Sequence, residues 1–174
     1  MSYRSTLPMA KNRELFKYYT EAVEHLKDYK KALEESITEI SSLDDIDELN
    51  TWAKIGYYKA KVELHEVTGK INAQENNKQV YQDRIELMMP EFEKLSAEAN
   101  VEFEKLIEDA ITLAKANPTN RYVQTIGMIL QGWNTIKDEK LESAVKQELK
   151  NETYKSLKTQ MEAVKQDKGK LKKA

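Results

Sequence analysis

The chain has 174 residues, with 28 Lys and Arg against 30 Asp and Glu, and it contains only five Gly, three Pro and no Cys. This composition excludes disulfides, thiolate nucleophiles and cysteine metal sites, and the shortage of turn residues argues against sandwiches and barrels. The length fits one domain, and the many charged residues are typical of long helices.

The first predicted helix covers 9–41 and follows Pro8, a residue that suits a first helical turn. Apolar residues recur at alternating spacings of four and three, which indicates a helix with one buried face. Further apolar residues widen this stripe on one flank, and a wide stripe favours a bundle over a bare two-stranded coil. We therefore expect an interface here, formed by Leu15, Tyr19, Leu26, Tyr29 and Leu33.

A turn is predicted at 41–45, where Ser and Asp favour helix starts, and a second helical region is predicted over 44–116. Small residues in its apolar stripe, including Gly56, predict close approach of another helix. Polar residues at core positions near 74–78 leave two alternatives open, a loop or a wet stretch of one helix. The apolar pattern keeps its phase across Pro90, which favours a kink over a boundary.

A second turn is predicted at 117–120, where Pro and capping residues cluster, and a third helix is predicted over 119–166. The fold class is therefore all-α, an antiparallel bundle of long amphipathic helices with coiled-coil-like packing. We expect a single domain over 9–166, between a flexible N-terminus (1–8) and a basic flexible tail (167–174).

No complete catalytic, cofactor or metal motif is found in the sequence. His65 begins a zinc-binding pattern that lacks its second His. Gly127 and Gly132 have the spacing of a phosphate-binding loop, but Trp133 stands where that loop needs Lys, so close helix contact explains these glycines better. Acidic residues over 91–109 are typical of a solvated helix face, and an enzyme whose carboxylates converge only in three dimensions is left as an alternative.

The C-terminal part of the chain is basic. Residues 150–174 hold eight Lys against three acids, a local charge of +5. Lysines of this kind bind nucleic acid weakly, without sequence preference and in a salt-dependent way. The candidate nucleic-acid contacts are Lys165, Lys168, Lys170, Lys172 and Lys173.

The segment 111–130, ITLAKANPTNRYVQTIGMIL, resembles the helical hairpin of small terminase subunits from tailed phages. In that family, a helix ends near a proline, an arginine follows, and a second apolar helix builds a ring-shaped oligomer that helps to select viral DNA. Here Pro118 and Arg121 are separated by two residues instead of being adjacent, and no helix-turn-helix precedes the hairpin. The resemblance implies a role as a nucleic-acid-handling accessory of a phage-like assembly.

The sequence predicts a non-enzymatic assembly, scaffolding or adaptor protein that binds protein partners and forms a homo-oligomer through helix faces. The phage-like accessory role and the hidden carboxylate enzyme are the alternatives. We expect no cofactor, metal or small-molecule substrate. No secretory signal or membrane-spanning segment is recognised, and with the absence of Cys this predicts a cytoplasmic location.

Overall fold

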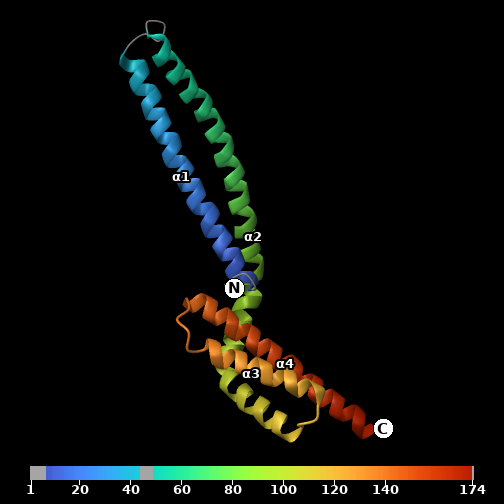
Figure 1. Ribbon diagram of the computed structural model, residues 1–174. Coiled ribbons are helices and arrows are strands. Elements are labelled where there is room, and N and C mark those ends of the chain that lie inside the picture. The colour runs from blue at the N-terminus through green and yellow to red at the C-terminus, as the bar shows by residue number, and fades with distance from the viewer. Residues whose placement is uncertain (1–6, 44–48, 174) are drawn as a thin grey trace. The chain divides into compact units, whose positions relative to one another are not determined.

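The computed structural model describes residues 7–43 and 49–173, with side chains up to 167 except that of residue 43. The flexible N-terminus expected over 1–8 and the turn expected at 41–45 lie largely outside the described residues. The described part contains no strand and is an all-α helical bundle, so the predicted fold class is confirmed. Its helices are α1 (Pro8–Leu43), α2 (Thr51–Ala116), α3 (Arg121–Ile136) and α4 (Ser143–Lys173) (Figure 1).

Helix α2 is continuous, with Pro90 inside it, and this decides between the alternatives left open by the sequence. A break at 74–78 or at Pro90 is wrong, and the polar residues form part of one helix. Gln74 and Lys78 are half-buried at core positions, and the Lys78 ammonium lies 5.9 Å from the centroid of the Phe16 ring. A long lysine stem covers apolar surface while its charge stays near solvent, so the helix continues without a loop.

The single helix predicted over 119–166 is wrong, because the structure has two helices there, α3 and α4. Residues 137–142 contain no Gly or Pro, so local propensity gives no reason to stop. Burial gives the reason. Trp133, Ile136 and Leu141 pack on one buried cluster that contains Val145, and the chain reverses so that these side chains meet. Helix α4 also continues past the expected end, to Lys173.

The chain divides into two compact units. The hairpin unit is Asn12–Glu86, and the terminal unit combines Met1–Lys11 with Leu87–Ala174. Both α1 and α2 contribute to each unit. The single domain expected over 9–166 stays a prediction.

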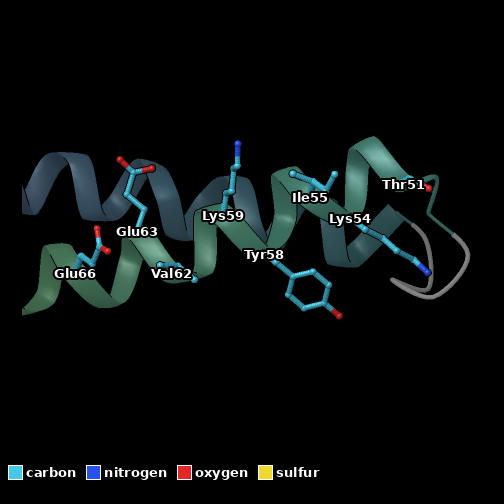
Figure 2. A pocket seen from close by; sticks show the side chains of 8 residues that line it. All are labelled: Thr51, Lys54, Ile55, Tyr58, Lys59, Val62, Glu63 and Glu66. Carbon is cyan, nitrogen blue, oxygen red and sulfur yellow. The ribbon is translucent and has the colours of Figure 1, made fainter.

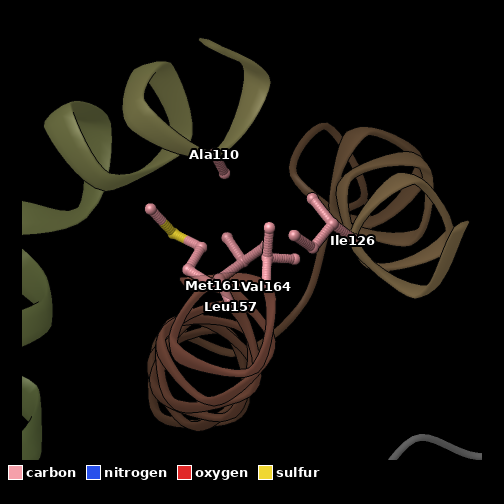
Figure 3. Close-up of a cluster of buried hydrophobic side chains, with 5 residues drawn as sticks. All are labelled: Ala110, Ile126, Leu157, Met161 and Val164. Atoms are coloured by element: carbon pink, nitrogen blue, oxygen red, sulfur yellow. The ribbon is translucent and has the colours of Figure 1, made fainter. Parts of the chain in front are cut away.

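The terminal unit has a closed apolar core made by three helices. Ala110 comes from α2, Ile126 from α3, and Leu157, Met161 and Val164 from α4. These five side chains converge between the helices in Figure 3, and all are buried. Three helices can surround a central stripe completely, and this is why the fully buried positions of the chain gather here.

Two buried polar side chains of α4 are satisfied within the terminal unit. The Glu148 carboxylate accepts hydrogen bonds from the Met9 and Ala10 backbone N–H groups, at 2.9 and 3.0 Å. It therefore caps the first turn of α1, whose amides have no partner inside the helix. The Asn151 amide nitrogen donates to the Ser96 hydroxyl at 2.7 Å, which joins α4 to α2. Both groups are buried without loss of hydrogen bonding.

In the described residues of the hairpin unit, the helical segments are one from α1 and one from α2, which run antiparallel side by side (Figure 1). The Tyr19 and Tyr81 rings stack between α1 and α2, with centroids 5.6 Å apart. Because two helices cannot enclose a stripe on every side, few residues of this unit are fully covered. Among the described side chains of 12–42 and 49–86, the buried apolar ones are Val23, Tyr57, Val67 and Ile71.

The glycine predictions are wrong for the described chain. Gly56 is exposed, and a Cβ built there would meet no atom within 4 Å. The same holds for Gly127 and Gly132, so no helix approaches closely at these positions. The neighbouring Tyr57 is buried instead, so the aromatic side chain and not the glycine takes the inward position on this turn of α2.

Candidate interaction surface

The interface residues predicted on α1 all lie in the hairpin unit. Leu15, Tyr19, Leu26 and Leu33 are half-buried. Tyr29 is 42% exposed, and its hydroxyl donates to the Glu63 carboxylate of α2. The hydrogen bond to Glu63, with desolvation and the carboxylate charge adding to it, raises the pKa of Tyr29. At least two of these residues thus contact α2, and their part in self-association stays a prediction.

A second apolar surface, which the sequence analysis did not identify, lies on α2. Ile55, Tyr58 and Val62 are 41%, 53% and 59% exposed, and their spacings of three and four place them on one helix face. We call these three residues the outer stripe. The inward face of the same helical segment carries Tyr57 and Ala60, so the outer stripe lies on another side of α2.

The outer stripe forms the floor of an open hollow of about 650 Å³. Every lining residue belongs to α2, so among the described residues no second helix contributes to the hollow, and Figure 2 shows these side chains along one helix. Such a shape suits contact with another elongated surface. The lining residues are Thr51, Lys54, Ile55, Tyr58, Lys59, Val62, Glu63 and Glu66.

The rim of the hollow is charged with both signs. Lys54 and Lys59 stand toward the start of α2, and Glu63 and Glu66 follow them. Glu63 is engaged by the Tyr29 hydroxyl, whereas no ion-pair or hydrogen-bond partner is found for Lys59 or Glu66 among the described residues. Lysine and glutamate at this rim are therefore available to a partner.

The terminal unit holds a polar cluster that involves one of the acids over 91–109. The Tyr154 hydroxyl donates to Glu102 Oε2 at 2.5 Å and accepts from Lys158 Nζ at 3.3 Å. Burial, followed by the hydrogen bond to Glu102, raises the pKa of Tyr154, and the hydrogen bond to Tyr154 raises that of Lys158. Tyr154 therefore keeps its proton at neutral pH, and its hydroxyl links α4 to α2.

The predicted nucleic-acid contacts lie on the last turns of α4. Lys165 is exposed. The backbone of 168–173 is helical, and the side chains of Lys168, Lys170, Lys172 and Lys173 lie outside the described ones. The backbone is therefore helical up to Lys173, in contrast to the flexible tail expected over 167–174. Contact with nucleic acid stays a prediction.

The described residues contain neither a cluster of metal ligands nor a helix that could cross a membrane. Over 7–43 and 49–173, no three His, Asp or Glu side chains gather as a metal site would require. Within these ranges, no helix combines the length and the apolar character needed to cross a membrane.

Comparison with known proteins gives no relative. The chain matches no protein-family model, no curated protein and no solved structure.

Proposed function

We propose that this chain is a non-enzymatic interaction protein that binds a helix of a protein partner through the outer stripe of α2. The observation that carries the proposal is the exposure of Ile55, Tyr58 and Val62 next to one another on one helix face. Neighbouring exposed apolar residues inside a charged rim are typical of protein interaction sites. Residues spaced i, i+3 and i+7 are the usual anchors when two helices pair.

The shape of the hollow also supports a protein partner. Sites for small molecules are concave and cover most of the ligand surface from several sides. Here a single helix supplies every lining residue, so a bound small molecule would remain mostly in water. A second helix laid along α2 would instead cover Ile55, Tyr58 and Val62 together, and the apolar area removed from water would favour binding.

Site-specific photo-crosslinking tests the proposal. A photoreactive phenylalanine analogue at Tyr58 should form a covalent adduct with a protein in cells that make this chain. The same analogue at the exposed Glu35 of α1 should form none. Val62→Asp should abolish the adduct, because it places a charge in the apolar contact. Val80→Asp is the matched control, since Val80 is an exposed valine of α2 outside the hollow. Absence of any adduct at Tyr58 would contradict the proposed function.

A further inference from the structure

We infer that the partner of the outer stripe is the outer stripe of a second copy of this chain, with the two α2 helices antiparallel and the twofold axis beside Val62. The inference rests on the proposed function, since it names the occupant of that same surface. A twofold contact is self-complementary, so each residue on one side of the axis meets a residue on the other side.

The first support is charge complementarity. Lys59 precedes Val62 by about one helical turn, and Glu66 follows it by about one turn. The two residues are seven positions apart and therefore lie on the same flank of the stripe. In an antiparallel pair, equal flanks face each other, so Lys59 of each copy comes opposite Glu66 of the other. The pairing occurs twice by symmetry.

A parallel pair has attractive and repulsive charge contacts in equal number. Parallel helices place one flank against the other flank of the partner at the same height. Lys59 would then lie near Lys54 of the second copy, which repels. Glu66 would lie near Lys61, which attracts, and each contact occurs twice. The antiparallel pair has the two Lys59–Glu66 attractions and one repulsion, between the two Lys61 residues beside the axis. Each Lys61 ammonium lies 5.1 Å from the centroid of its own Tyr57 ring. The antiparallel orientation therefore has the better balance of charges.

The second support is steric. Ile55 precedes Val62 by seven residues and Gly69 follows it by seven, so each Ile55 falls at the height of Gly69 in the second copy. A Cβ built on Gly69 would meet no atom within 4 Å, and the surface there is open. The missing side chain leaves room for the isoleucine. Because the contact is only one helix wide, we expect a weak dimer that depends on concentration.

Charge reversal tests the inference on the full chain by sedimentation equilibrium. Lys59→Glu and Glu66→Lys should each weaken the dimer by about tenfold, because like charges then meet at both symmetric contacts. The double variant K59E/E66K should restore most of the affinity. Lys17→Glu, at an exposed lysine of α1, is the control and should leave the affinity unchanged. Circular dichroism of each variant checks that the helices remain. A double variant no tighter than the single ones would overturn the inference.

Disulfide trapping tests the register, and the chain suits it because it has no native cysteine. Val62→Cys should form a dimer on oxidation, since the axis brings the two copies of residue 62 together and a disulfide needs Cα atoms within about 7 Å. Ile55→Cys should not, because the antiparallel register separates its two copies by about 20 Å. Efficient trapping at 55 would indicate a parallel pair and overturn the inference.

The two proposals fail in different ways. If the wild-type chain is monomeric at every concentration while Tyr58 still crosslinks to another protein, the partner is not a second copy of this chain. The further inference then fails, and the proposed interaction surface stands. If Tyr58 gives no adduct of any mass, the proposed function itself fails. An adduct of twice the chain mass, about 40 kDa, supports both.

Discussion

The hairpin unit and the terminal unit are built from the same kind of amphipathic helix, yet they bury different amounts of it. In the terminal unit, Ile126, Leu157 and Val164 are fully buried between three helices. In the hairpin unit, Leu26 and Leu33 are only half-buried between two. The number of neighbouring helices, and not the composition of the stripe, decides how far a leucine leaves water.

This difference explains where an interaction surface is expected. The three-helix core of the terminal unit covers its central stripe, and the large apolar side chains that stay exposed in the described part of that unit are Leu87, Val101, Ile111 and Met128. A two-helix hairpin leaves apolar side chains in water, and Tyr18, Tyr29, Tyr58 and Val62 are all exposed there. The hairpin unit therefore gains more from a partner than the terminal unit does, because more apolar area remains to be covered.

The strongest way to test the comparison is to remove one leucine from each unit. Leu157→Ala should lower the free energy of unfolding by about 2–5 kcal/mol, since it leaves a cavity in a closed core. Leu26→Ala should lower it by about 1–2 kcal/mol, because water already reaches this side chain and fills the space. Urea unfolding followed by circular dichroism measures both. Equal losses of unfolding free energy would show that the core of the hairpin unit is as closed as the core of the terminal unit.

The buried cap of α1 should have the next largest effect. Glu148→Ala leaves the Met9 and Ala10 amides without their acceptor and should cost about 1–2 kcal/mol. Glu152→Ala, one turn later on α4 and exposed, is the matched control and should change stability little. Thermal unfolding of the two variants gives the comparison. A similar loss in both would indicate a general charge effect and not a cap.

Tyr154 should make the stability of the terminal unit depend on pH in the alkaline range. Its pKa is raised in the folded chain, so the folded state keeps a proton that the unfolded state loses above about pH 10. Stability is fully present below that pH and falls as the pH rises through the folded pKa. Tyr154→Phe should lower stability by about 1 kcal/mol at neutral pH and should flatten the alkaline fall. Melting temperatures from pH 8 to about pH 11 measure this. Tyr18→Phe, at an exposed tyrosine, should keep the wild-type profile.

The smallest effect should come from the ion pair of the hairpin unit. Lys27 Nζ lies 3.1 Å from Glu75 Oε1, and both side chains are about half exposed. Exposed pairs are screened by water and salt, so Glu75→Gln should change the free energy of unfolding by less than about 0.5 kcal/mol. Urea unfolding at low and high salt is the measurement. If Glu75→Gln lowered the free energy of unfolding as much as Glu148→Ala, the exposed carboxylate would contribute as much as the buried one, and the prediction would be wrong.

Much of the fold was predictable from the sequence because its causes are local. Apolar spacing at the helical period and the scarcity of Gly and Pro predicted an all-α chain, and the capping residues at 117–120 predicted the turn before α3. Asn120 indeed caps α3, and its side chain accepts from the Tyr122 N–H at 2.9 Å. The interaction surface was less accessible. Ile55, Tyr58 and Val62 form a second apolar stripe in the sequence. They are the same kinds of residue as those of the buried stripe, so residue type alone does not tell which stripe is exposed.

The sequence by itself determined which segments are helical, since hydrogen bonding and side-chain periodicity act within a few residues. Only the tertiary structure decided three other features. It separated α3 from α4, because Trp133, Ile136 and Leu141 are buried together only if the chain reverses. It supplied the acceptor for the first turn of α1 from Glu148, more than a hundred residues away. It also left the outer stripe of α2 exposed, because α1 is the one other helix described in the hairpin unit and it packs against the opposite, inward face of α2.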